Sequence, residues 1–331
     1  MKKAILTFIC IGTITFAIAQ KETNNWYFGY SSAINFNSGS PVSLSGGLCN
    51  TSEGSASISD KDGNLLFYTD GNTVWNKNNA VMVNGTGLLG NFSSSQSAII
   101  VSWPGSDSLY YIFTVDEETG PDGLRYSIVN TSLQGGLGEL TIKNILVKTP
   151  TSEKITAVCQ PNGIDYWVIT HDWGNNNFLA YSITSTGFNN TPVVSSVGTS
   201  ANGSSTNAIG YLKASPQGDK LAQAIWASNY FELFDFDKTT GIVSHDLKLN
   251  SFSGASSGAY GVEFSPDGTK LYGTVITPGY IYQWDVSLAT DDEIKASKVL
   301  VGTSAVNFNG AVQLASDGKM YLAELSSPWL G

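Results

Sequence analysis

Cysteine and histidine are scarce in this sequence: its 331 residues include three cysteines and two histidines. The cysteines lack the spacing of a metal site, and the sequence contains neither an H-E-x-x-H nor a G-x-S-x-G motif. These absences leave few catalytic arrangements open. Cys49 and Cys159 could pair in an oxidising compartment. We expect instead that Cys159, at an inner-strand position, is a buried free thiol.

Charged residues are also few, at 13% of the chain, and acidic residues outnumber basic ones. The formal net charge of −10 becomes −12 when Lys2 and Lys3 are left out. A chain this acidic is repelled by nucleic acid and by anionic lipid surfaces, so neither is an expected partner. Beyond residues 4–17, no stretch is apolar enough to cross a membrane, and we expect no membrane insertion.

Residues 1–19 have the features of a signal peptide. Lys2 and Lys3 form the positive end, residues 4–17 the apolar stretch, and residues 17–19 an A-x-A cleavage site. We therefore predict export, with the mature chain beginning at Gln20 and located outside the cell or on its outer surface. Residues 20–331 show no Pro- or Ser-rich linker and no shift in composition, which predicts a single domain.

What the sequence does contain is a repeat of an apolar strand, a short turn and a second apolar strand. Most copies follow one another at intervals of about 50 residues, the length of a blade built from short strands. Glycine provides the positive φ of the tight hairpin in most copies. The sequence therefore predicts an all-β fold, a β-propeller with four-stranded blades. The turns fall at Gly63, Asp107, Gly163, Gly218, Gly268 and Gly318.

One copy shows the expected blade most fully. Residues 208–215, 220–226, 230–237 and 241–250 are predicted to be its four strands, in order from the inside of the ring outward. The third strand places aromatic residues on both faces, as expected for blades packed face to face with their neighbours. Helix signals are nearly absent from the chain. Residues 287–298 are predicted to form one helical turn between two strands.

The repeat pattern has extra strands before its first copy and too few strands in its last copy. Residues 26–44 precede the first copy and are interpreted as outer-strand material, and Gly331 follows shortly after the second strand of the sixth copy. A propeller closes by combining strands from both ends in one blade, so that no strand edge is exposed. We therefore expect a C-terminally incomplete chain, with N-terminal closing strands, from a protein of seven blades or, as the alternative, six. Its open blade predicts that residues 20–331 fold poorly alone.

Three segments carry a family resemblance: residues 24–39, 51–90 and 93–101. They resemble the N-terminal propeller of large exported proteins of gliding bacteria, the gliding-motility-associated proteins with a type B sorting domain for type IX secretion. The S-P-D-G-T-K-L-Y sequence at 265–272 is similar, less specifically, to YVTN and lactonase-type propellers. The resemblance implies downstream modules of the same longer chain as partners, and it supplies no catalytic residues.

Five residues are candidates for ligand binding: Asp70, Asp116, His171, Asp172 and Trp173. They fall at or just after the second strands of their blades, and we expect these loops on the face that frames the central channel. Carboxylates beside a histidine and an exposed tryptophan suit a cation or the ring of a sugar. The alternative is that they are ordinary solvated loop tips. We predict no metal site and no cofactor, although a calcium ion in the channel or a loop stays an unsupported alternative.

We predict a non-catalytic binding or scaffolding module of an adhesion- or gliding-associated protein, with a polysaccharide or a cell-surface protein as its partner. The alternative is a propeller hydrolase or lyase acting on sugars or lactones. Such a site needs acidic and amide groups at the channel, for which Glu263 and Asn207 are candidates. His245 lies beside Asp246 on an outer strand and is expected to face solvent, which leaves His171 for any Ser-His-Asp arrangement. A third hypothesis is a structural cap without a ligand.

Overall fold

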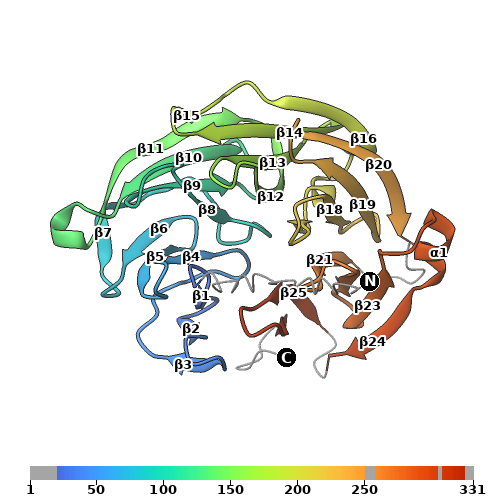
Figure 1. Ribbon diagram of the computed structural model, residues 1–331, viewed down its shortest axis with the longest axis horizontal. Helices are drawn as coiled ribbons and strands as arrows, with labels where there is room; N and C mark the ends of the chain where they lie inside the picture. The colour runs from blue at the N-terminus through green and yellow to red at the C-terminus, as the bar shows by residue number, and fades with distance from the viewer. Residues whose placement is uncertain (1–20, 250–257, 305–307, 325–331) are drawn as a thin grey trace, which may run out of the picture.

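The computed structural model describes residues 21–249, 258–304 and 308–324. These residues form 26 strands, one short α-helix and two 3-10 turns. The strands lie in sheets arranged in a ring around a central axis (Figure 1). The predicted all-β propeller fold is therefore confirmed. We number its sheets blade 1 to blade 7 in chain order.

Blades 1 to 3 contain the N-terminal strands. Blade 1 consists of β1 (Asn25–Phe28), β2 (Ser32–Asn35) and β3 (Val42–Leu44). Blade 2 consists of β4 (Ala56–Ser59), β5 (Leu65–Thr69), β6 (Thr73–Asn76) and β7 (Val81–Thr86). Blade 3 consists of β8 (Ala98–Ser102), β9 (Leu109–Val115), β10 (Leu124–Asn130) and β11 (Glu139–Lys148), with η1 (Gln134–Gly136) before β11. A single parallel residue pair, Val83 with Glu139, joins blades 2 and 3 into one hydrogen-bonded sheet.

Blades 4 to 7 complete the described ring. Blade 4 consists of β12 (Thr151–Cys159), β13 (Tyr166–Asp172), β14 (Asn175–Thr184), β15 (Gly187–Phe188) and β16 (Val193–Ala201). After η2 (Ser205–Asn207), blade 5 consists of β17 (Leu212–Ala214), β18 (Lys220–Ile225), β19 (Tyr230–Asp237) and β20 (Ile242–Leu249). Blade 6 consists of β21 (Ala259–Phe264), β22 (Lys270–Val275), β23 (Tyr280–Asp285) and β24 (Val299–Thr303), with α1 (Asp291–Ala296) before β24. The described part of blade 7 consists of β25 (Asn309–Leu314) and β26 (Met320–Glu324).

The hairpins that define the repeat are present in the structure. At Gly63 φ is 86° and at Gly268 it is 71°, a left-handed conformation that residues with a side chain seldom adopt. A Cβ on Gly268 would lie 2.1 Å from Gln217 Oε1, the end of a side chain that can rotate away, so the conformation is what favours glycine there. Positive φ values also occur at Gly163, Gly218 and Gly318.

Strand β19 shows why aromatic residues occur on both faces of a blade. Phe231 packs against Trp284 of blade 6, with ring centroids 5.5 Å apart. Phe234, on the opposite face, packs against Phe178 of blade 4 with centroids 4.9 Å apart. All four side chains are fully buried. Because burying a phenylalanine side chain contributes about 1.5–3 kcal/mol, these faces hold neighbouring blades together.

The predicted helical turn is the short helix α1. The Thr290 hydroxyl accepts a hydrogen bond from Glu293 N at 3.3 Å, and the Glu293 carboxylate accepts one from Thr290 N at 3.0 Å. This reciprocal capping box satisfies donors that the first turn of a helix leaves unpaired. A six-residue helix therefore forms where the sequence predicted one.

The N-terminal strands form a blade of their own, which corrects the prediction that they are outer closing strands. Asn25 of β1 lies beside the inner strand of blade 2: its Nδ2 donates to Ser59 Oγ at 2.8 Å, and its carbonyl accepts from Ser57 Oγ at 2.5 Å. Within the described ranges, no strand of blade 1 pairs with β25 or β26. Instead, Tyr321 of β26 packs against the rings of Trp26 and Phe36, at 5.8 and 5.5 Å. Blades 7 and 1 thus meet through aromatic side chains.

Candidate functional site

Loops that lead into the inner strands of several blades are joined by hydrogen bonds near the axis of the ring, and we call this cluster of residues the channel mouth. A hydrogen bond of 2.6 Å from the Tyr260 hydroxyl to Glu53 Oε2 connects blade 6 with the loop before blade 2. On the other side of the ring, Ser95 before blade 3 contacts Glu153 of blade 4 and Gly210 before blade 5. We define the mouth by Glu53, Ser95, Glu153, Tyr211 and Tyr260.

Blades 3, 4 and 5 are joined by buried polar side chains. Gln96 Oε1 accepts hydrogen bonds from Ile155 N at 3.1 Å and from Leu212 N at 2.8 Å, so one amide links three blades. Glu153 Oε2 accepts from both the amide and the hydroxyl of Ser95, at 2.7 and 2.6 Å. These groups are buried and paired, which is the condition under which polar groups fix a unique geometry.

Lys154 lies next to Glu153 on the inner strand and is also buried. Its Nζ donates to the carbonyl oxygens of Ala208 and Ile209, at 2.8 and 3.0 Å, and so ties blade 4 to the loop before blade 5. Burial lowers the pKa of Lys154 to about 7, against the attraction of Glu153 and Glu232. Burial likewise raises the pKa of Glu153. The pair is therefore a structural clamp between blades.

Glu53 is the titratable group whose surroundings suit proton transfer. Burial raises the pKa of its carboxyl to about 7, with the hydrogen bond from Tyr260 acting in the opposite sense and the Glu153 carboxylate adding to the rise. Its other oxygen accepts from Ser93 Oγ at 3.4 Å. The ring of Tyr211 stands edge-on to Tyr260, with centroids 5.5 Å apart. A carboxyl with a pKa near neutrality can both take up and release a proton at physiological pH.

Asp70 is buried in the turn between β5 and β6. Its Oδ1 accepts hydrogen bonds from Asn72 N at 2.9 Å and from Thr73 N at 2.8 Å. Its carbonyl accepts from Ser97 Oγ at 2.9 Å, which places this turn beside the entry to blade 3. The turn therefore lies near the channel mouth, and the carboxylate itself stabilises the turn.

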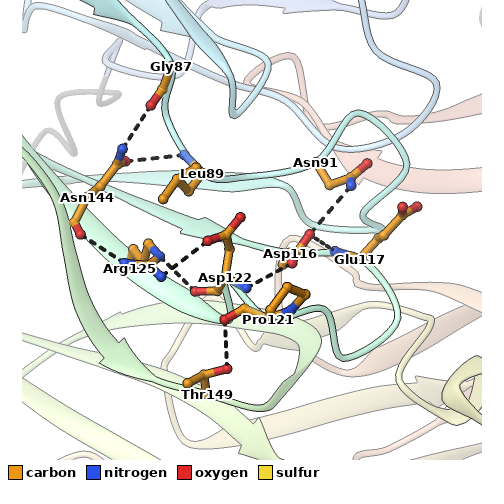
Figure 2. A network of polar contacts seen from close by, with 10 residues as sticks. All are labelled: Gly87, Leu89, Asn91, Asp116, Glu117, Pro121, Asp122, Arg125, Asn144 and Thr149. Carbon is orange, nitrogen blue, oxygen red and sulfur yellow. Dashed lines mark hydrogen bonds and ion pairs between the residues drawn. The ribbon is translucent and has the colours of Figure 1, made fainter.

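Asp116 is also buried, in the loop between β9 and β10. Its Oδ1 accepts from Glu117 N at 2.9 Å and Asn91 Nδ2 at 3.5 Å, and its Oδ2 accepts from Asp122 N at 3.1 Å (Figure 2). The next residue but one, Glu118, donates its amide to Glu153 at 2.8 Å. The loop therefore reaches the mouth, while the Asp116 carboxylate holds the loop in shape.

His171 is almost fully buried, at 1% exposure. Burial lowers its pKa to about 4, and the ring stands edge-on to Phe178 with centroids 4.7 Å apart. Its Nδ1 lies 2.8 Å from the carbonyl oxygen of Asp172. The hydroxyl of Ser152 donates to the His171 carbonyl rather than to the ring. The imidazole is therefore neutral, and these contacts contain no Ser-His pair.

Asp172 and Trp173 follow at the end of β13. The Asp172 carboxylate accepts from Trp173 N at 2.8 Å and pairs with Lys148 Nζ at 3.1 Å. Trp173 is partly exposed in the turn before β14. The structure thus brings the loops of all five predicted residues to the same end of the ring, and ligand binding by them stays a prediction.

Glu263 and Asn207, the predicted lactonase-type pair, have separate partners. Glu263 Oε2 lies 3.2 Å from Lys213 Nζ, and Asn207 Oδ1 accepts from Ser228 Oγ at 3.0 Å. His245 is exposed on β20, as expected, between Asp235 at 3.2 Å and Asp291 at 3.0 Å.

The two cysteines of the described chain are free, and Cys49 is buried. Cys159 is exposed, which corrects the expectation of a buried thiol. The reason is its position as the last residue of β12, where the strand leaves the packed interior.

In the ranges that the structure describes, no group of three His, Cys, Asp or Glu side chains could hold a metal ion. No helix in those ranges has the length and apolar character needed to cross a bilayer.

The sequence analysis did not identify Glu53, Tyr260 or the Glu153–Lys154 pair. Glu53 and Tyr260 are 207 residues apart, and only closure of the ring brings them together. The pair left a signal in the sequence, because two adjacent charged residues in an otherwise apolar and neutral inner strand must find partners inside the fold.

Comparisons with known proteins place the fold in a class. The sequence matches no protein-family profile and no curated protein. Among solved structures, the chain is similar to hydrazine synthase of Kuenenia stuttgartiensis, at 14% identity over 98% of both chains with a TM-score of 0.59. It is similar to the Cps50 (Swd1) β-propeller domain of Myceliophteria thermophila, at 10% identity over 92% and 93% of the chains with a TM-score of 0.56. It is also similar to the periplasmic gluconolactonase PpgL of Pseudomonas aeruginosa, at 13% identity over 92% and 89% with a TM-score of 0.52.

These similarities define the protein as a β-propeller, in agreement with the expected distant likeness to lactonase-type propellers. Their identities lie between 10% and 14%, so they establish the fold alone. Two of the names state different activities, a hydrazine synthase and a gluconolactonase, and one fold can serve many functions. The function must therefore be argued from the channel mouth.

Proposed function

We propose that the protein hydrolyses lactones at the channel mouth. The observation that carries this proposal is the Glu53 carboxyl, with a pKa of about 7, hydrogen-bonded to Tyr260 at the meeting point of blades 2 and 6. The fold likeness to a periplasmic gluconolactonase supports it as an analogy, because it shows a lactone-hydrolysing protein built on the same kind of ring.

In this mechanism Glu53 acts first as a base and then as an acid. The Glu53 carboxylate takes a proton from a water molecule while the water oxygen attacks the lactone carbonyl carbon. The Tyr211 hydroxyl, which has no hydrogen-bond partner among the described residues, donates to the carbonyl oxygen as it gains charge. When the ring C–O bond breaks, Glu53 returns the proton to the leaving oxygen. The product is the open hydroxy acid, and Glu53 is again a carboxylate.

The test is hydrolysis of glucono-1,5-lactone by the purified chain, measured as acid release above the spontaneous rate. Glu53→Gln keeps an acceptor for Tyr260 and removes the base, so we expect kcat/KM to fall by about 100-fold or more. The matched control is Glu139→Gln on the outer strand β11, which should retain the wild-type rate. Equal loss in both variants, or no turnover by the wild type, would contradict the proposal.

A non-catalytic module that binds a polysaccharide or a cell-surface protein is the second candidate. It is favoured by Trp173, which stays partly exposed in a polar loop at the mouth end of the ring. Saturable glycan binding without turnover, abolished by Trp173→Ala, would support it. Trp103→Ala, at a partly exposed tryptophan beside the hairpin between β8 and β9, is the control and should bind normally.

We also propose that the protein acts outside the cytoplasm, as one module of a longer gliding- or adhesion-associated chain. The support is the signal-like sequence of residues 1–19 and the resemblance of residues 24–101 to such proteins. Cleavage before Gln20 in the secreted protein, determined by N-terminal sequencing, is the expected result.

A further inference from the structure

The chain offers no arginine with which to bind an anionic substrate. Its only arginine is Arg125. The guanidinium donates to the carbonyl and carboxylate of Asp122, at 2.8 and 3.2 Å, and to the carbonyl of Asn144 at 3.2 Å (Figure 2). Asn144 in turn holds the main chain at Gly87 and Leu89. Arg125 thus uses its guanidinium to fix loops of blades 2 and 3 through three hydrogen bonds. It is therefore not placed to bind a phosphate in the bidentate manner.

Three lysines close to the channel and to the mouth loops have carbonyl or carboxylate partners within the fold. Lys154 donates to two main-chain carbonyls, Lys213 pairs with Glu263 at 3.2 Å, and Lys148 pairs with Asp172 at 3.1 Å. These three lysines of the described chain therefore have their charge engaged within the fold.

Carboxylates surround the mouth instead. Glu153 and Glu117 both act on Glu53 as like charges. Glu118 reaches across blade 4 to the loop before blade 5, where its Oε2 accepts from Ser205 Oγ at 2.6 Å. In a partly buried site such charges repel an anion strongly, because water screens them poorly there.

From this distribution of charge we infer that the mouth accepts an uncharged sugar lactone and rejects its phosphorylated counterpart. The inference rests on the proposed function and specifies its substrate class. The same charges also act on the product. Hydrolysis converts a neutral lactone into a carboxylate, so repulsion from Glu117 and Glu153 favours release of the product.

The experiment compares kcat/KM for glucono-1,5-lactone and for 6-phosphoglucono-1,5-lactone with the full chain. We expect a preference of about 100-fold or more for the neutral lactone. Raising the ionic strength from about 0.02 to 0.5 M shortens the Debye length from about 20 Å to about 4 Å, so it should raise the rate with the phosphorylated lactone several-fold and leave the neutral one unchanged.

Charge reversal sharpens the test. Glu117→Lys at the mouth should raise the ratio of kcat/KM for the phosphorylated lactone to kcat/KM for the neutral lactone about tenfold. The control Glu139→Lys on outer strand β11 should change neither. Equal rates for both lactones, or a preference for the phosphorylated one, would overturn the inference and leave the proposed function standing. Failure to hydrolyse either lactone would overturn both, so the two failures are distinguishable.

Discussion

Blades 3 to 5 and the junction of blades 7 and 1 are held together in different ways. On the first side, Gln96, Glu153 and Lys154 connect inner strands through buried hydrogen bonds of 2.6 to 3.1 Å. At the junction, the described residues meet through the rings of Trp26 and Tyr321. Buried polar networks specify one geometry, whereas aromatic packing tolerates small shifts.

The candidate site joins blades 2 and 6, which lie between these two regions of the ring. Glu53 belongs to the loop before blade 2 and Tyr260 to blade 6, and they are joined by one hydrogen bond of 2.6 Å. The polar clamp of blades 3 to 5 fixes Glu153, whose charge acts on Glu53. The Glu53 carboxyl, which accepts hydrogen bonds from Tyr260 at 2.6 Å and from Ser93 at 3.4 Å, is thus held near a fixed charge. The clamp and the candidate site therefore share Glu153, which joins blades 3 and 4 and also acts on the pKa of Glu53.

The clamp should give the largest loss of stability when it is broken. Lys154→Met removes the donor for two buried carbonyls and the positive neighbour of Glu153. We expect the free energy of unfolding to fall by about 3 kcal/mol or more, because each buried carbonyl left without a donor costs about 1–3 kcal/mol. Urea denaturation followed by fluorescence measures it. A loss below about 1 kcal/mol would show that the clamp is dispensable.

Glu53 should destabilise the folded chain at neutral and higher pH. Its folded pKa of about 7 exceeds the ordinary 4.5, so the folded state holds the proton more tightly, and stability is lost as the pH rises through about 7. Glu53→Gln removes this titration. We expect the variant to be about 2–3 kcal/mol more stable than the wild type at pH 8, with the gain fading toward pH 4. A gain that is constant with pH would contradict the assignment.

The aromatic junction should be less sensitive than the clamp. Tyr321→Leu removes the edge contacts with Trp26 and Phe36 and keeps an apolar side chain. We expect a loss of about 1–2 kcal/mol in the free energy of unfolding. A loss as large as that of Lys154→Met would remove the distinction between the two sides.

The smallest effect is expected at the exposed contact between His245 and Asp291. Asp291→Asn removes one of the two carboxylates beside His245, at 3.0 Å. Both partners are solvated, so the free energy of unfolding should change by about 0.5 kcal/mol or less. A change above 1 kcal/mol would mean that α1 stabilises blade 5 more than its exposure indicates.

The fold could be predicted largely from the sequence because each hairpin carries its own signal. Gly63 and Gly268 mark turns that need positive φ, and the alternation in residues 230–237 predicts β19 at its observed bounds. Blade 1 was misassigned because residues 26–44 lack the repeated Asp-Gly hairpin. Its position depends on contacts between Asn25 and blade 2, which are not local in the sequence.

The candidate site was less accessible to sequence reasoning. Asp70 and Asp116 were recognised as loop carboxylates, but their hydrogen bonds to nearby amides and their burial depend on the folded loops. His171 was expected in an accessible loop and is buried because it lies within β13, one residue before its end, inside the packed blade. Glu53 and Tyr260 become a pair only when the ring forms. Long-range closure is the step that a single sequence does not reveal.

The most direct test of the account is the pH dependence of kcat/KM for glucono-1,5-lactone, compared between the wild type and Glu53→Gln. If Glu53 is the base, the wild-type value rises through about pH 7 to a plateau, and the variant stays low and flat. If the variant keeps the wild-type rate and the same rise, Glu53 is not the base and the channel mouth is not the catalytic site.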